Sequence, residues 1–251
     1  MKFLSLLVFL LVVANLYTQI AVQGESTKIF DVAIGESGSG VIELYNQSQI
    51  PINIKITQVD YLYNSNKEVF YLEAGKYERS NASWLRYAPS MSIMPNQTIR
   101  YPFSFVVPRV STLNGSYWSV LLVEQDYFFS MESVQDVVFT TRFAIQIVHN
   151  IKNTGNVNLS FLETVFEESG AIIFVRNTGT RWFEASLKLD IYDTSAQLVR
   201  SQQARNSIYP GLERQFEITF NPLPPGEYYA VIILDCGNNQ IFGHQANFRI
   251  R

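Results

Sequence analysis

Hydrophobic and polar residues alternate along most of this chain, and the longest regular alternation runs over residues 134–148. Six residues share one nearly apolar face when the stretch is read with a period of two: Val137, Phe139, Thr141, Phe143, Ile145 and Ile147. The opposite face is mixed and carries Arg142 among small residues. This pattern predicts a β-strand of roughly 40–50 Å at about 3.3 Å per residue. A strand of that length either crosses a whole β-sandwich or is offered to a binding partner.

The rest of the chain, from Lys28 onward, consists of short alternating runs separated by Asn, Gly, Pro and Ser, with almost no helical periodicity. Such a pattern is typical of β-sandwiches and barrels. Three pairs of segments also resemble each other and follow in the same order. These pairs are 40–56 with 170–191, 92–108 with 207–222, and 115–124 with 226–235. The repetition predicts two related β-sandwiches.

The repeated segments contain turn residues with a clear physical role. Pro95 and Pro210 each begin a turn that leads into an alternating strand. Tyr117 and Tyr228 each follow a Gly-containing turn, as does the tyrosine corner of immunoglobulin-like sandwiches, whose hydroxyl bonds to nearby backbone. We therefore predict an all-β fold of two tandem immunoglobulin-like β-sandwich domains, at residues 25–149 and 159–251. A polar run at residues 150–158 is the predicted linker.

The two predicted domains differ in one place. Asn46 and Pro95 are 49 positions apart, whereas the matching Asn177 and Pro210 are 33 apart, so the first domain has 16 additional residues. They fall in a Tyr-rich insertion at residues 61–87. About half of its aromatic side chains are expected to pack on the sandwich, and an exposed patch that binds sugars or a protein is the alternative.

The first 24 residues are predicted to be an export signal. Lys2 provides the positive start, residues 3–14 form a nearly unbroken apolar run, and Gly24 suits a signal peptidase. An uncleaved membrane anchor is the alternative, because residues 16–21 prolong the apolar stretch. No later segment is long enough to span a bilayer. We expect an exported, periplasmic protein whose mature chain begins near Glu25, with membrane contact only through an uncleaved signal.

Composition and charge exclude several classes of function. The net charge is −3 with mixed signs, so nucleic acid is not an expected partner. The single cysteine, Cys236, excludes an intrachain disulfide, and the two histidines lie in different predicted domains. No motif for a hydrolase, a metalloprotease or a phosphate loop is present. We predict a non-enzymatic protein with no catalytic residues, cofactor or metal.

Residues 235–239 allow three interpretations. Cys236 can be a structural thiol or, with His244 nearby, a nucleophile, and the structural role is favoured. Asp235, Asn238 and Asn239 can form a calcium site or an Asn/Gly hairpin turn. The turn is favoured because it explains the same residues without a ligand.

Several of these features together resemble one family, the periplasmic chaperones of pilus assembly by the chaperone–usher pathway. They are a Pro95-led strand, a Tyr117-bearing turn, an apolar strand ending in Glu124, and the long strand 134–148 before a linker. The resemblance covers residues 28–251 and implies a divergent relative. It implies that the long strand of the first domain is lent to a pilin-like subunit by β-augmentation. An outer-membrane usher is the second partner that it implies.

The resemblance also implies a pair of basic residues that hold the C-terminal carboxylate of the client near the interdomain cleft. Arg142 is the candidate on the long strand and Lys28 the candidate on the first strand. Both are slightly displaced from the family pattern, which places a basic residue at Ala144. The family's basic residue that leads into the linker has no better counterpart here than His149. Val138, Thr140 and Ala144 are the predicted groove-facing residues. The alternative function is an adhesion module that binds through its loops and the insertion at residues 61–87.

Overall fold

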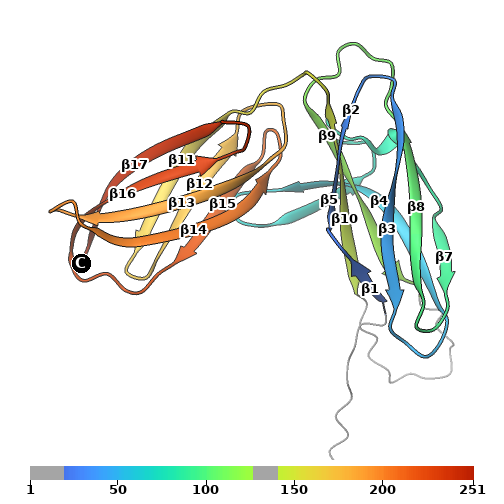
Figure 1. Ribbon diagram of the computed structural model, residues 1–251, viewed down its shortest axis with the longest axis horizontal. Coiled ribbons are helices and arrows are strands. Elements are labelled where there is room, and N and C mark those ends of the chain that lie inside the picture. The colour runs from blue at the N-terminus through green and yellow to red at the C-terminus, as the bar shows by residue number, and fades with distance from the viewer. Residues whose placement is uncertain (1–19, 127–140) are drawn as a thin grey trace, which may run out of the picture.

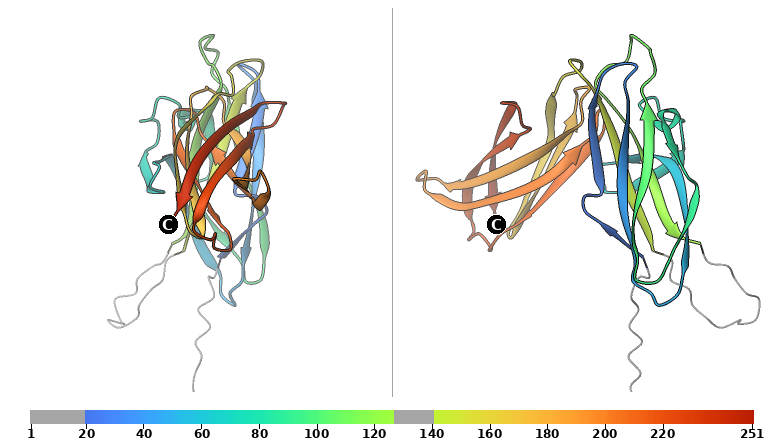
Figure 2. Two further views of the ribbon diagram at one scale, coloured as in Figure 1. Left: turned by 90° about the vertical axis from the view of Figure 1, so that its left-hand side faces the viewer. Right: turned by 45° about the vertical axis from the view of Figure 1, so that its right-hand side comes forward.

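The structure is a computed structural model that describes residues 20–126 and 141–251. It contains two β-sandwiches: in Figure 1 domain one stands upright at the right, and domain two lies to its left with its strands running roughly horizontally. The same arrangement is seen from two other directions in Figure 2. Residues 127–140 lie outside the described part, so the predicted strand 134–148 can be followed only from its second half.

Domain one is a sandwich of two sheets. The first sheet consists of β1 (Ile20–Gln23), β3 (Ser37–Asn46), β8 (Thr98–Val106) and β6 (Leu85–Tyr87), paired in that order. The second consists of β2 (Thr27–Val32), β10 (Arg142–Ile151), β9 (Ser116–Gln125), β4 (Ile52–Tyr63) and β5 (Val69–Glu73), with β7 (Ser90–Ile93) also paired to β4. A short 3-10 helix, η1 (Ala82–Trp84), precedes β6.

Domain two repeats the plan with seven strands. Its first sheet consists of β11 (Leu159–Glu167), β12 (Gly170–Asn177) and β15 (Glu213–Thr219). Its second consists of β14 (Leu198–Ile208), β13 (Phe183–Asp193), β16 (Gly226–Asp235) and β17 (Ile241–Ile250). The structure thus confirms the predicted all-β fold of two immunoglobulin-like sandwiches.

The period-two pattern determines which side chains form the two cores. In β10, Ile145 and Ile147 are 1% and 0% exposed and belong to the core of domain one, and Phe143 packs against it. In β16, Ala230, Ile232 and Leu234 belong to the core of domain two. The predicted apolar face of β10 therefore faces the core over its described length.

The internal repeat is reproduced at atomic detail by two buried asparagines. Asn46 Nδ2 donates to the carbonyls of Ile50 at 2.8 Å and Ile93 at 3.0 Å. Asn177 Nδ2 donates in the same way to the carbonyls of Arg181 and Ile208. Each amide thus donates to two carbonyl groups, one in the adjoining turn and one on a strand distant in sequence. The repeated Asn therefore makes equivalent bonds where each domain turns between its equivalent strands.

The two predicted tyrosine corners also form. The Tyr228 hydroxyl donates to the Pro224 carbonyl at 2.8 Å. In domain one, the Tyr117 hydroxyl accepts from the Asn114 N–H at 3.3 Å. Both hydroxyls bond to backbone a few residues upstream, as the spacing predicted.

The start of domain one requires a correction to the predicted boundary at Gly24. Residues 20–23 form β1 and pair with β3, and Ile20 is 1% exposed in the core. The folded domain therefore begins at or before Ile20, and a mature chain that starts near Glu25 would lack one strand. Cleavage of a signal peptide remains a prediction.

A chain that begins at Glu25 is expected to be about 2–3 kcal/mol less stable than one that begins at Asn15, because the burial of Ile20 is lost. Urea unfolding of the two proteins measures this difference. Equal free energies of unfolding would show that β1 does not contribute to the domain.

The Tyr-rich insertion divides into a buried part and an exposed part. Tyr61, Tyr63 and Trp84 are 7%, 3% and 5% exposed. The strand β5, by contrast, is exposed along its whole length. This agrees with the expectation that about half of the aromatic residues pack on the sandwich.

Candidate functional site

One edge of β10 is open at its N-terminal end. The strand pairs with β9 from Arg142 to Asn150, but with β2 only from Gln146, which lies opposite Thr27. Within residues 20–126 and 141–251, no strand pairs with residues 142–145 on the side away from β9.

The direction of the backbone groups identifies which residues are open. The Gln146 N–H donates to the Ser26 carbonyl at 2.8 Å, and the Lys152 N–H donates to the Val32 carbonyl at 2.8 Å. Alternate residues of a strand direct their N–H and C=O groups to the same edge. The main-chain groups of Arg142 and Ala144 therefore point to the open edge, where a further strand can pair with them.

The path of the first strand explains why this edge is open. β1 pairs with β3 in the first sheet, and the chain then crosses to the second sheet through residues 24–26. Gly24 has a φ of 80°, a conformation that glycine adopts without strain. Because β2 begins to pair with β10 only at Thr27, opposite Gln146, it does not extend alongside residues 142–145.

Arg142 lies at the beginning of this open edge. Its Nε and Nη2 atoms lie 2.9 Å and 2.8 Å from Glu124 Oε2 on the neighbouring strand β9. The side chain is 53% exposed, so the ion pair contributes at most about 1 kcal/mol to stability. A client carboxylate at Arg142 would have to compete with Glu124.

The structure does not bring Arg142 and Lys28 together. Lys28 lies opposite Ile147, five residues from Arg142 along β10, or about 16 Å at 3.3 Å per residue. It shares its face of β2 with Phe30 and Val32, which pack on the core of domain one. Arg142 is on the opposite face of the sheet. The predicted joint anchor for one carboxylate is therefore not supported.

Of the remaining predicted site residues, the structure describes one, Ala144, and not the other two. Ala144 lies on the open edge and is partly buried against the interdomain cluster described below. Val138 and Thr140 lie outside the described residues. Lys28, Ala144 and Arg142 are thus the predicted site residues that the structure places.

His149, the best available counterpart of the family's basic residue before the linker, is a buried core residue and offers no charge at the surface. It is 0% exposed, and its ring packs against Phe105 at 4.3 Å and Phe30 at 5.3 Å between ring centroids. Asn81 Nδ2 lies 2.7 Å from His149 Nδ1, so the amide donates to that nitrogen and the ring proton is on Nε2. Burial lowers the pKa of His149 to about 3.

The buried His149 predicts a specific dependence of stability on pH. The unfolded chain binds a proton at this ring below about pH 6.5, whereas the folded chain does so only near pH 3. Its contribution is complete above pH 6.5 and is lost by about 1.4 kcal/mol per pH unit as the pH falls toward 3. Urea unfolding between pH 7 and 4 is expected to show a shallower slope for His149→Phe than for the wild type. Equal slopes would show that the ring is not neutral in the fold.

The second face of β10 meets domain two through an aromatic cluster. Tyr209, from the turn between β14 and β15, is 0% exposed and lies between Trp118, Tyr61 and Tyr63 of domain one. The ring centroids of Tyr209 and Trp118 are 4.7 Å apart. The Tyr209 N–H donates to the Tyr63 hydroxyl at 3.1 Å. Domain two is thereby attached to the same sheet that carries the open edge.

Backbone contacts close the other side of the joint. The Ser116 N–H donates to the Thr180 carbonyl at 2.8 Å, and the Ser116 hydroxyl accepts from the Trp182 N–H at 2.7 Å. Gly115 has a φ of 76°, and a Cβ there would overlap the carbonyl oxygen of Thr180. The two domains therefore pack with no space between their backbones at this point.

A neutral polar group lies where β2 begins beside the open edge. Gln146 Oε1 accepts hydrogen bonds from the Tyr209 hydroxyl and, at 3.3 Å, from Thr27 Oγ1. The family pattern led to the expectation of basic residues in this region. The sequence analysis did not identify Gln146 and Tyr209 as residues of this region. The available signal was that Tyr209 directly precedes Pro210 in the repeated turn.

The residues considered for catalysis form ordinary structure. Burial, and secondarily Asp235, raises the pKa of the Cys236 thiol to about 12, which disfavours the thiolate that a nucleophile requires. Residues 236–240 form the favoured hairpin turn, in which the Cys236 N–H donates to the Gln240 carbonyl at 2.9 Å. In the described part of the chain, no group of three or more His, Cys, Asp or Glu side chains could hold a metal. The same part contains no helix long and apolar enough to cross a membrane.

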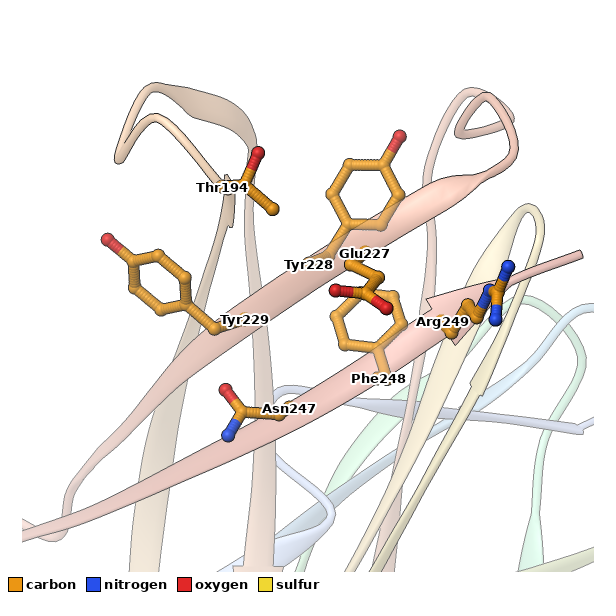
Figure 3. Close-up of a pocket in the computed structure, with 7 residues that line it drawn as sticks. All are labelled: Thr194, Glu227, Tyr228, Tyr229, Asn247, Phe248 and Arg249. Carbon is orange, nitrogen blue, oxygen red and sulfur yellow. The ribbon is translucent and has the colours of Figure 1, made fainter.

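Two surface pockets lie away from the open edge. A pocket of about 600 Å³ beside the linker includes the ion pair between Arg181 and Asp31. A second, of about 450 Å³, lies where β16 begins and β17 ends (Figure 3). It is lined by Thr194, Glu227, Tyr228, Tyr229, Asn247, Phe248 and Arg249. Neither pocket includes a residue of β10.

Comparison with known proteins establishes the fold. No protein-family model and no curated protein sequence matches the chain. Among solved structures, it is similar to the class 5 fimbriae chaperone CfaA, with a TM-score of 0.52 and 12% identity over 90% of this chain and 98% of that one. A chain from a chaperone–tip adhesin complex of CFA/I fimbriae biogenesis matches with the same TM-score and identity, over 91% of this chain and 98% of that one. The predicted resemblance to pilus-assembly chaperones is therefore confirmed at the level of the two-domain fold.

Proposed function

We propose that this protein is an exported, non-enzymatic chaperone that binds a β-rich, pilin-like client by adding a client strand to the open edge of β10. The observation that carries the proposal is that, among the described strands, none pairs with the outward main-chain groups of Arg142 and Ala144. A client strand at this edge would exchange backbone hydrogen bonds with both residues, which is recognition by β-augmentation. The fold shared with fimbrial chaperones agrees with this mode of binding.

The position of the edge beside the interdomain joint extends the contact surface. Tyr209 fixes domain two against the same sheet, and Gln146 with Thr27 lies at the end of the open segment. A client strand that pairs with residues 142–145 would reach this neutral polar group. Main-chain pairing, with Ala144 at its centre, is the main source of affinity in this proposal.

Arg142 has a secondary role in the proposal because Glu124 already pairs with its guanidinium. Lys28 is too far from Arg142, and on the wrong face, to hold the same carboxylate. Charge-assisted anchoring of a client C-terminus by both residues is therefore not part of the proposal. Periplasmic localisation and an outer-membrane usher remain proposals that depend on the identity of the client.

Ala144→Pro is expected to abolish client binding, because proline removes the N–H that points to the open edge. The substitution leaves pairing with β9 intact, since alternate residues make those bonds, and proline is tolerated at a strand edge. Ala144→Ser retains the N–H and is the matched control. Both proteins are to be expressed in the native cell and purified with their bound chains.

The expected result is that the wild type and Ala144→Ser retain the same exported, β-rich chains and that Ala144→Pro loses them. Retention by Ala144→Pro would contradict the proposal. It would instead favour the alternative adhesion module, in which binding depends on the insertion at residues 61–87 and not on β10.

A further inference from the structure

The strand β5 has an unusual surface for a sheet edge. All five residues are exposed, and four consecutive ones are large and apolar: Val69, Phe70, Tyr71 and Leu72, at 47%, 46%, 43% and 39% exposure. Figure 1 shows the β4–β5 hairpin extending from domain one toward domain two. A flat, apolar edge of this kind is a site for pairing with another strand.

Other long edge strands of the described chain carry features that discourage such pairing. β11 has a register shift between Phe161 and Glu163. β14 carries Arg200 and Arg205, and β17 carries Arg249. β5 pairs with β4 without a register shift and has no charged residue before Glu73. Bulges and charges are the usual protection of sheet edges, and residues 69–72 have neither.

The backbone of β5 presents unpaired groups on its outer side. The Asn64 N–H donates to the Glu68 carbonyl at 3.1 Å, which identifies this pair as one that faces β4. Because the direction alternates along a strand, Phe70 also faces β4, whereas the N–H and C=O groups of Val69 and Tyr71 face outward. Among the described strands, none pairs with them there.

We infer that β5 pairs antiparallel with β5 of a second copy of this chain, about a two-fold axis at Tyr71. In this register Tyr71 lies opposite its own copy, in a pair whose backbone groups both face outward. Phe70 of each copy lies opposite Leu72 of the other, an apolar pair that occurs twice, and Val69 lies opposite Glu73 at the two ends. The pairing is isologous and joins the second sheets of two domain-one sandwiches into one continuous sheet.

The charges beside β5 are compatible with self-pairing. Lys67 forms an ion pair with Glu217 of domain two, and Glu73 lies 3.6 Å from Lys76. The two copies therefore approach each other with neutralised flanks. Four half-exposed side chains per copy bury less surface than the roughly 1,200–2,000 Å² of a standard interface, so the dimer is weak and depends on concentration.

This dimer leaves the proposed client edge free. β5 and β10 lie on opposite sides of β4 and β9 in the same sheet. Occupation of β5 by a second copy therefore does not cover Arg142 or Ala144. Pairing of β5 with a second copy therefore does not depend on client binding at β10, and either can be disproved without the other.

Sedimentation velocity over a concentration series tests the inference on the full chain. The wild type is expected to shift from monomer to dimer as its concentration rises, and Tyr71→Lys is expected to remain monomeric. Leu162→Lys is the matched control, because Leu162 is 45% exposed on the edge strand β11. It is expected to dimerise like the wild type. A monomeric wild type, or a dimer that persists in Tyr71→Lys, would overturn the inference.

Cross-linking tests the register. In Tyr71→Cys the two introduced thiols lie directly opposite each other, at a Cα separation of about 5.5 Å that suits a disulfide. The native thiol of Cys236 is 5% exposed in domain two and does not interfere. Mild oxidation is expected to give a covalent dimer of Tyr71→Cys and none of Leu162→Cys. Absence of the Tyr71→Cys dimer, or equal cross-linking of both variants, would contradict the two-fold pairing.

Discussion

Tyr209→Ala is expected to lower the free energy of unfolding by about 3–5 kcal/mol, as the loss of a large buried aromatic side chain does. The ring is fully buried, and its contacts are with Tyr61, Tyr63 and Trp118 of the other domain. Truncation leaves a cavity between the domains and removes the one fully buried domain-two side chain of the interdomain cluster. Urea unfolding followed by tryptophan fluorescence and circular dichroism measures the loss, and two separated transitions are expected once the domains are uncoupled.

Tyr209→Phe is the matched control for this substitution. It keeps the ring in its socket and removes only the hydroxyl that donates to Gln146. A loss of about 1 kcal/mol, with a single transition, is expected for one hydrogen bond. An equal loss in the two variants would show that the hydroxyl, and not the packing of the ring, couples the domains.

Gly115→Ala is expected to destabilise the protein by about 3 kcal/mol, because two costs are added. The residue has a φ of 76°, which L side chains rarely adopt, and a Cβ would overlap the Thr180 carbonyl oxygen of domain two. The first cost is about 1 kcal/mol and the second about 1–3 kcal/mol. The joint between the domains must move to accept the methyl group. Chemical denaturation measures the effect.

Gly75→Ala separates the two costs. Gly75 has a φ of 84°, and nothing lies within 4 Å of an added Cβ. Its substitution is expected to cost only about 1 kcal/mol, from backbone conformation alone. If Gly115→Ala is no more costly than Gly75→Ala, the contact between Gly115 and Thr180 does not hold the domains together.

The sequence predicted those parts of the fold that depend on local pattern. Asn46 and Asn177 stand at equivalent places in the repeat and make equivalent hydrogen bonds. Tyr117 and Tyr228 follow equivalent glycines and bond to nearby backbone. In each case the residue and its partner lie close in sequence or in a repeated turn, so one chain was sufficient to identify them.

The candidate site was less predictable, because its geometry depends on pairing between distant strands. Lys28 and Arg142 were paired as an anchor from their positions along the chain alone. The face of the sheet that Lys28 occupies depends on the register, which places Lys28 opposite Ile147. A shift of one residue changes the face of every side chain. The same limit applies to His149, whose position in β10 is visible in the sequence but whose burial depends on Phe30 and Phe105.

The sequence also did not predict that β1 pairs in the first sheet while the following strand, β2, pairs in the second. The apolar residues at positions 20–22 continue the pattern of an export signal, and their pairing with β3 depends on contacts 20 or more residues away. Their place in the first sheet explains why β10 has an open edge. The feature that supports the proposed function therefore arises from a tertiary pairing that no local pattern encodes.

Amide hydrogen exchange at Ala144 tests the central proposal most directly. In the free protein the Ala144 N–H points to the open edge and is expected to exchange rapidly, whereas the neighbouring Ile145 N–H faces β9 and is protected. When the client that copurifies with the wild type is bound, the account predicts strong new protection of Ala144 and little change at Ile145. Client binding that leaves the exchange of Ala144 unchanged would contradict strand addition at β10.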